Sequence, residues 1–168
     1  MGFFSLLLVG VLSSCSLLFP DRTAPKSSSY LVTPPPEPWK KLHVGDDANS
    51  TETLQADIAY ENPDTGAMIS LSTLCRKYNT TSLRELSLSL VRGIDDRQVR
   101  KEEERLISGV HALDTTYEGL VDKVHLLIHT VVLVKDYCTY DFIYVAVPSR
   151  EKNSAETFEQ FIQSFRAD

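Results

Sequence analysis

The chain has no excess of positive charge and, outside its N-terminal stretch, no long apolar run, and each shortage excludes a class of protein. It carries 17 Lys and Arg residues against 23 Asp and Glu residues, so its net charge is −6. An acidic chain with dispersed Lys and Arg lacks the basic surface that nucleic-acid binding requires. No second apolar run approaches the roughly 20 residues of a transmembrane helix. We therefore expect neither nucleic acid as a partner nor a spanning segment in the body of the chain.

Short catalytic motifs are also missing. The sequence contains no Gly-x-Ser-x-Gly nucleophile turn, no phosphate-binding loop and no dinucleotide-binding fingerprint. His125 and His129 are four residues apart, but on a strand they lie about 13 Å apart, too far for one metal ion. We expect a protein that is not an enzyme and that holds neither a metal nor another cofactor.

The N-terminal stretch carries the most specific pattern. An apolar run over residues 3–11 is too short to span a bilayer and is typical of a secretory signal. It leads into residues 12–15 (Leu-Ser-Ser-Cys), which resemble the bacterial lipobox, where the cysteine thiol receives a diacylglycerol after cleavage. We expect residues 1–14 to be a lipoprotein signal peptide and Cys15 to be the lipidation site.

One feature of this stretch departs from the lipobox pattern, because residues 1–14 contain no Lys or Arg. An ordinary cleaved signal or a short membrane anchor with an incidental cysteine is the alternative. Ser16, directly after Cys15, resembles lipoproteins sorted to the outer membrane. The predicted location is therefore the outer membrane of a bacterial envelope, facing the periplasm.

Cysteine is scarce, and only Cys75 and Cys138 remain once Cys15 is set aside. An even pair in an oxidising compartment favours a Cys75–Cys138 disulfide. Two separate buried thiols are the alternative. A catalytic thiol is less favoured, because neither cysteine has a histidine beside it in sequence.

The rest of the chain divides into a tether and one domain. Residues 15–38 are rich in Pro and Ser and poor in residues that pack, which is typical of an extended spacer. Residues 39–168 are enough for a single domain with a core.

Alternating apolar residues predict most of this domain to be strand. The expected strands cover residues 39–44, 57–61, 67–75, 111–118, 124–134 and 138–147. The segment Arg97 to Ile107 is ambiguous, because its charged residues favour a helix by propensity yet also suit an edge strand. We choose the strand.

Two helices complete the predicted domain. The first begins at a capping box of Ser82 and Glu85 and ends near Gly93; its apolar face is Leu83, Leu86, Leu90, Val91 and Ile94. The second is capped by Asn153 and presents Phe158, Phe161, Ile162 and Phe165. The order of elements predicts an α+β fold, an antiparallel sheet with two main helices packed on it.

Two groups inside the last strand are worth attention. Asp141 lies among apolar residues, so a buried carboxylate would require a partner such as an arginine or a backbone amide. Tyr140, Phe142 and Tyr144 share one face of the same strand. Packing against the phenylalanine helix explains them, and the alternative is the lining of a site for an apolar ligand.

Several of these stretches together resemble a family of uncharacterised bacterial outer-membrane lipoproteins with a PsbP-like fold. They are Trp39, residues 57–62 with Gly66, Leu83–Gly93, residues 109–113, residues 138–142 and Phe158–Arg166. The resemblance implies docking or assembly without a shared catalytic site, and it implies that Cys75 and Cys138 recur as a pair. The charged residues 100–105 depart from the more apolar strand that the family would have.

These features lead to three functional hypotheses. The first is a lipid-anchored, non-enzymatic accessory protein that docks on another envelope component, with the membrane and an envelope protein as partners. The second is a carrier of lipid or a small apolar ligand, lined by Tyr140, Phe142 or Tyr144. The third is a hydrolase, which would need Ser or Cys beside His and an acid.

Overall fold

The computed structural model describes residues 29–44, 56–76, 81–151 and 154–167. The expected signal peptide, the lipidation site Cys15 and the expected helix cap Asn153 therefore lie outside the described residues. Neither helix in these ranges is long and apolar enough to cross a membrane.

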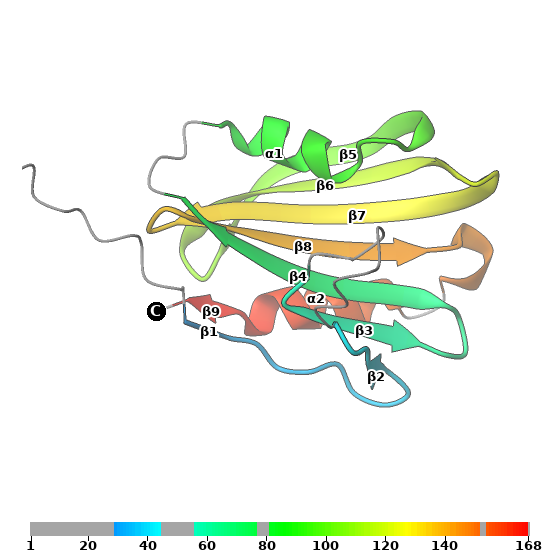
Figure 1. Cartoon of the computed structure of the whole chain (residues 1–168), viewed down its shortest axis with the longest axis horizontal. Helices are drawn as coiled ribbons and strands as arrows, with labels where there is room; N and C mark the ends of the chain where they lie inside the picture. Colours follow the sequence, from blue (N-terminus) through cyan, green and yellow to red (C-terminus); the bar gives the residue numbers. More distant parts are fainter. Residues whose placement is uncertain (1–28, 45–55, 77–80, 152–153, 168) are drawn as a thin grey trace, which may run out of the picture.

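Seven strands form one antiparallel sheet in the spatial order β2-β3-β4-β8-β7-β6-β5 (Figure 1). They are β2 (Lys40–Lys41), β3 (Ile58–Asn62), β4 (Ala67–Cys75), β5 (Asp95–Ile107), β6 (Val110–Val121), β7 (Val124–Lys135) and β8 (Cys138–Ala146). The last four follow one another through two-residue turns whose residues have positive φ, the geometry that suits the twist of a hairpin. The predicted strands are thus confirmed, except that the first is confined to Lys40–Lys41.

The domain begins earlier than residue 39. Tyr30–Leu31 forms β1, which pairs with β9 (Arg166–Ala167) in a small second sheet. The Tyr30 ring packs against Tyr140 and Phe165, with ring centroids 6.2 and 6.0 Å apart. Residues 30–38, expected as part of the spacer, therefore run along the fold. The proline-rich composition predicts a spacer, and the strand that pairs with Tyr30–Leu31 lies at the other end of the chain, where local sequence patterns do not reveal it.

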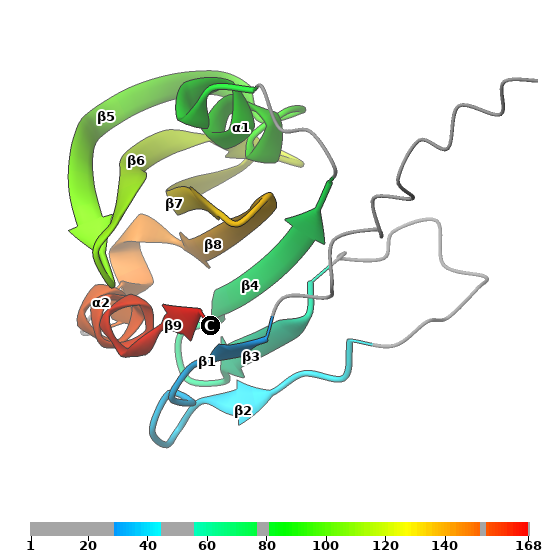
Figure 2. The same ribbon diagram turned by 90° about the vertical axis from the view of Figure 1, so that its left-hand side faces the viewer.

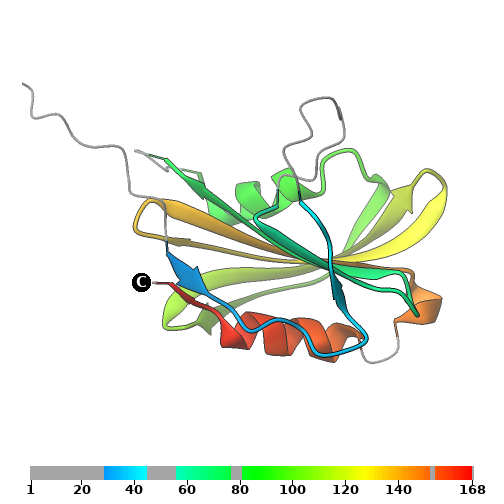
Figure 3. The same cartoon turned by 60° about the horizontal axis from the view of Figure 1, so that its bottom comes forward.

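Helix α2 (Ser154–Ser164) covers one face of the sheet (Figures 2 and 3). Its predicted apolar face is confirmed, since Phe158, Phe161 and Ile162 are buried together with Phe165 just after the helix. These side chains pack on alternate residues of β8. The main core lies between α2 and the sheet.

Helix α1 (Leu83–Leu90) lies on the opposite face (Figure 3). Its predicted capping box is confirmed. The Glu85 backbone amide donates to Ser82 Oγ at 3.2 Å, and the Ser82 amide donates to the Glu85 carboxylate at 3.0 Å. The Ser82 hydroxyl also donates to the Glu85 carboxylate at 2.9 Å, and these two bonds from the Ser82 amide and hydroxyl lower the pKa of Glu85. A small second core joins this side of the sheet through Val91, Tyr117 and Ile128.

The ambiguous charged segment is strand β5, so the predicted strand is confirmed and the helical alternative is wrong. As an outer strand of the sheet, β5 keeps most of its charged side chains in water. Ion pairs connect it to its surroundings, including Arg100 with Glu118 and Arg84 of α1 with Glu102. A charged edge discourages pairing with another chain. The predicted class is right in its parts, but the sheet dominates and both helices are short.

Candidate functional site

A groove lies beside α1 on the face of the sheet opposite α2. Helix α1 packs over β6 and β7 and leaves β4 and β8 uncovered next to it. The groove between them has a volume of about 1050 Å³. The side chains that characterise it are Leu74, Arg76, Leu88, Arg92, Arg97 and Asp141, and we call it the arginine groove.

Three arginines approach this groove from three elements. Arg76 follows β4, Arg92 follows α1, and Arg97 lies in β5. The Arg97 guanidinium donates to the Val91 carbonyl at 2.8 Å, which holds it against the end of α1. Within the described ranges, the side chains of Arg76 and Arg92 form no hydrogen bond or ion pair. The groove therefore presents two exposed guanidinium groups whose donors are available to a ligand.

Apolar side chains lie between these charges. Leu74 of β4 and Leu88 of α1 both line the groove and are both exposed, by 49% and 38%. Two exposed leucines beside unpaired arginines make an amphipathic surface, because each leucine would gain from being covered. The sequence analysis missed this groove, since its residues come from four separate elements. The one local signal was Leu88, which falls outside the predicted apolar face of α1.

Asp141 lies at the floor of the groove. It occupies β8 opposite Ser72 of β4 and Val132 of β7. Its Oδ1 atom is buried without a hydrogen-bond partner in the part of the chain that the structure describes. Burial raises the pKa of this carboxyl to about 6. The expected arginine or backbone-amide partner for Oδ1 is therefore absent among these residues, and the cost of burial appears as a shifted protonation equilibrium instead.

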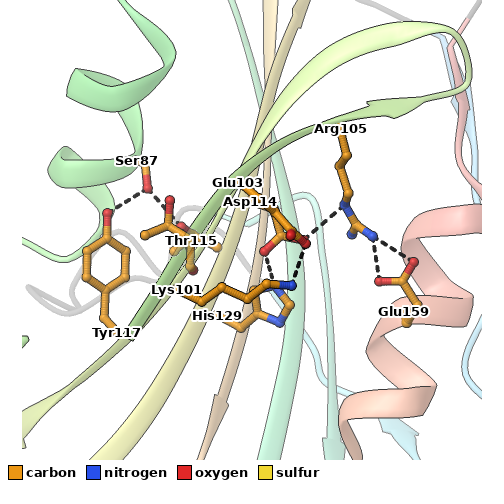
Figure 4. A network of polar contacts seen from close by, with 10 residues as sticks. Ser87, Lys101, Glu103, Arg105, Asp114, Thr115, Tyr117, His129 and Glu159 are labelled. Atoms are coloured by element: carbon orange, nitrogen blue, oxygen red, sulfur yellow. Dashed lines mark hydrogen bonds and ion pairs between the residues drawn. The ribbon is translucent and has the colours of Figure 1, made fainter. Parts of the chain in front are cut away.

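Hydroxyl groups fasten α1 to the sheet next to the groove (Figure 4). Ser87, the buried residue of α1, shares hydrogen bonds with the Tyr117 hydroxyl at 2.8 Å and with Thr130 Oγ1 at 2.9 Å. All three hydroxyls are buried, so each requires a partner. The network fixes the helix that forms one wall of the groove.

A second polar cluster lies on the α2 side of the sheet (Figure 4). Asp114 Oδ1 is 2.5 Å from His129 Nε2, and Asp114 Oδ2 is 3.0 Å from Arg105 Nε. Arg105 also donates to both carboxylate oxygens of Glu159 on α2, at 2.7 and 2.8 Å. The cluster joins three strands to the helix that covers them.

This cluster contains two parts of a familiar catalytic arrangement. A carboxylate that orients a histidine is part of nucleophilic sites, which also need a hydroxyl or thiol within reach of the imidazole. Among the described residues, no serine, threonine or cysteine is bonded to His129, whose ring instead packs edge-on to Phe158 at 5.0 Å. The arrangement is that of a packed histidine in an ion-pair network. Sequence analysis placed His129 on a strand correctly but did not connect it to Asp114.

His125, the second of the two histidines expected on one strand, lies at the start of β7, whereas His129 lies in the middle of it. His125 Nε2 is 3.7 Å from a Glu118 carboxylate oxygen in an exposed position. Within the described ranges, no group of three His, Cys, Asp or Glu residues is placed to hold a metal ion.

The predicted disulfide is confirmed. Cys75 and Cys138 are paired across β4 and β8, with their sulfur atoms 2.03 Å apart. The bond joins the two strands that form the floor of the groove, beside Leu74 and Arg76. The alternative of two separate thiols is wrong.

The aromatic face of β8 is part of the core. Tyr140, Phe142 and Tyr144 are buried, and each ring contacts a phenylalanine of the α2 region. Tyr140 and Phe142 lie 5.0 and 5.1 Å from Phe165, and Tyr144 stacks on Phe158 at 5.5 Å. The rings fill the space between sheet and helix, so the structure gives them the packing role rather than that of a ligand lining.

The fold, an antiparallel sheet with one helix on each face, is similar to that of PsbP-like structures. No protein-family model and no curated protein matches the sequence.

Solved structures do match. The cyanobacterial PsbP protein of a Synechocystis species, CyanoP, has a TM-score of 0.54 at 15% identity, covering 95% of this chain and 100% of its own. LpqN of Mycobacterium tuberculosis, described as involved in cell envelope biogenesis, has a TM-score of 0.63 at 12% identity and 87% coverage of each chain. At these identities the likeness concerns the fold alone.

Proposed function

We propose that this protein is a lipid-anchored, non-enzymatic accessory protein of the bacterial cell envelope that docks on another envelope protein through the arginine groove. Its anchor is Cys15, and its place is the periplasmic face of the outer membrane, as a member of the lipoprotein family that its sequence resembles. The observation that carries the proposal is the pair of guanidinium groups of Arg76 and Arg92, which have no side-chain partner among the described residues, beside the exposed leucines 74 and 88.

The chemistry of the groove selects the kind of partner. Arginine binds carboxylates through two parallel N–H donors, and it is enriched where proteins meet. The leucines add apolar area, and the three arginines that line the groove outnumber its two carboxylates, Glu85 and Asp141. We infer that the groove receives an acidic segment of the partner that carries apolar side chains between its carboxylates.

Two further observations support a binding role over catalysis. The histidine and acid that lie together, His129 and Asp114, have no described nucleophile beside them and are packed under α2. Tyr140, Phe142 and Tyr144, which could have lined a carrier site, pack against phenylalanines of the α2 region instead. LpqN, a neighbour in fold, is described as involved in cell envelope biogenesis, which is consistent with an envelope role here.

A site-specific cross-link tests the proposal. A photo-reactive amino acid at Leu88 of the full, membrane-attached protein should capture one envelope protein, through a peptide rich in Asp and Glu. Arg92→Glu should abolish this cross-link, because it places a negative charge against the acidic segment. Arg150→Glu, an exposed arginine in the short 3-10 turn Pro148–Arg150, is the matched control and should leave the yield unchanged.

The other outcomes are equally decisive. A cross-link to lipid at Leu88, without protein, would replace docking by the carrier function. Capture that is indifferent to Arg92→Glu, or equal from a probe at Val124, the exposed first residue of β7, would contradict the groove as the docking site.

A further inference from the structure

The most exposed apolar side chains of the described residues lie at one end of the molecule. Leu31, Tyr137 and Leu106 are exposed by 70%, 63% and 61%, more than any other large apolar side chain there. They belong to three different elements, which are β1, the β7–β8 turn and the end of β5. Exposing such groups costs free energy in water, so a common position on the surface calls for an explanation.

Direct contacts place these three elements at one end of the molecule. Leu31 pairs with Arg166 of β9, whose guanidinium donates to Ser108 in the β5–β6 turn at 3.2 Å. The Lys135 ammonium group, next to the β7–β8 turn, donates a hydrogen bond to the Ala167 carbonyl of β9. Figures 1 and 3 both show β1, β9 and the two turns together at this end.

The same end receives the chain from the anchor. Tyr30, the first residue of β1, follows the expected lipidation site Cys15 by 15 positions. A fully extended chain spans about 3.3–3.6 Å per residue, so the start of β1 cannot be more than roughly 50 Å from the lipid. The tether therefore keeps this end of the domain within reach of the bilayer.

The polar groups at this end also suit a phospholipid surface. Arg76, Lys135 and Arg166 lie there, Arg76 through its backbone hydrogen bond to the Tyr137 carbonyl at 3.0 Å. The facing carboxylates are Asp136 in the turn, 3.9 Å from Lys135, and Asp57, which accepts from the Tyr30 hydroxyl. Tyrosine favours the interface between headgroups and acyl chains, and basic side chains can reach the phosphates.

We propose that this membrane-facing end, formed by Leu31, Leu106 and Tyr137 with Arg76, Lys135 and Arg166, rests on the phospholipid layer that holds the Cys15 lipid. The proposal rests on the lipid anchor of the proposed function and adds an orientation to it. The anchor keeps the local concentration of bilayer high, so weak insertion of three side chains suffices. A second copy of the chain is a poorer occupant, because a stable interface needs about 800 Å² from each partner and three separated side chains fall short of that.

Quenching by brominated lipids tests the orientation. The full chain, carrying Trp39→Phe and Tyr137→Trp, is reconstituted through its lipid into vesicles of phosphatidylethanolamine and phosphatidylglycerol with brominated acyl chains. The fluorescence of the tryptophan introduced at position 137 should shift to the blue and be quenched. A tryptophan at Val124, the exposed first residue of β7 at the opposite end of that strand, is the matched control and should remain unquenched. Adding Leu31→Asp and Leu106→Asp, both at exposed positions, should remove the quenching at position 137 while circular dichroism stays unchanged.

Flotation of the vesicles and mass spectrometry of Cys15 read the anchor independently. A lipidated protein that floats, yet shows no quenching at position 137 or equal quenching at 124, overturns the orientation and leaves the anchor intact. A Cys15 without lipid overturns both proposals. Quenching that survives Leu31→Asp with Leu106→Asp also overturns the orientation, because the contact would then not depend on this end.

Discussion

Two aspartates with buried carboxylate oxygens show how differently one residue type behaves on the two faces of the sheet. Asp114 is surrounded by cations and donors, with Arg105 and His129 both in contact. Asp141 has an oxygen without a partner among the described residues, and burial raises its pKa to about 6. Asp114 therefore has charged partners for its buried carboxylate, whereas Asp141 is more compatible with the fold when it is protonated.

Asp141→Asn should stabilise the protein, and the gain should depend on pH. The ordinary pKa of this carboxyl is 3.8, so the folded state binds the proton more tightly than the unfolded state does. Stability must then fall as pH rises from about 4 through 6, by at most about 3 kcal/mol, since one pKa unit corresponds to about 1.4 kcal/mol. The amide has no such penalty. Thermal unfolding of both proteins should show a gain that is largest above pH 7 and shrinks toward pH 4.

The control is Asp122→Asn, in the exposed turn after β6, where the melting temperature should hardly change. A loss of stability in Asp141→Asn at pH 8 would mean that the carboxylate is paired in solution, and the assignment of an unpaired buried acid would be wrong.

Helix α1 depends on polar contacts more than on its apolar face. Its buried residue is Ser87, not one of the leucines that the periodicity selects. The helix has only eight residues, a length that is marginal in water without tertiary support. Its position beside the groove is therefore set by the hydroxyl network with Tyr117 and Thr130.

Ser87→Ala should lower the free energy of unfolding by about 1–3 kcal/mol, because it leaves buried hydroxyls without their partner. Urea denaturation measures the loss. In the double variant Ser87→Ala with Tyr117→Phe, the loss of stability should be smaller than the sum of the two single losses. Both substitutions remove the same hydrogen bond, the one between Ser87 and Tyr117. Ser89→Ala, at an exposed position of the same helix, should stay within about 0.5 kcal/mol of the parent. Strict additivity would contradict the network.

The disulfide is the second device at the scale of elements. It connects β4 to β8 across 63 positions of sequence, and α1 with three strands of the sheet lie in the loop that it closes. Replacing both Cys75 and Cys138 by alanine should reduce stability by about 2–4 kcal/mol, mainly by freeing the unfolded chain. Reduction of the parent should lower its melting temperature similarly and leave the double variant unaffected. An unchanged melting temperature after complete reduction would contradict this expectation.

At the scale of the whole molecule, function depends on where the domain is held. Both proposals use the same geometry, in which the groove opens beside α1 and the membrane-facing end carries the tether. Arg76 borders both surfaces, so a partner in the groove would lie close to the bilayer. We therefore expect such a partner to be another protein that is attached to the membrane or embedded in it.

Cys15→Ala should release the protein from the membrane or leave it unprocessed, because diacylglycerol transfer requires the thiol. Membrane fractionation and the mass of the mature protein measure this. Ser16→Ala is the control and should preserve both processing and attachment. Normal processing and unchanged fractionation of Cys15→Ala would refute the lipobox assignment.

Local patterns were sufficient for most elements. The capping box at Ser82, the β-branched residues of β7, the aromatic face of β8 and the phenylalanine face of α2 all followed from the chemistry of residues close in sequence. Pairing between distant segments was out of reach, as for Tyr30 with Ala167 or Arg105 with Asp114. Such contacts depend on strand order and register, and the alternation of one strand carries no information on its neighbour.

The sequence by itself predicted most of the elements and favoured the cysteine pair, because periodicity and turn residues act locally. Only the tertiary structure decided which face of the sheet stayed open, which arginines lacked partners and which apolar residues gathered at the tether end. Those properties belong to surfaces assembled from several elements, and their energetics arise from burial and charge pairing after the chain has folded.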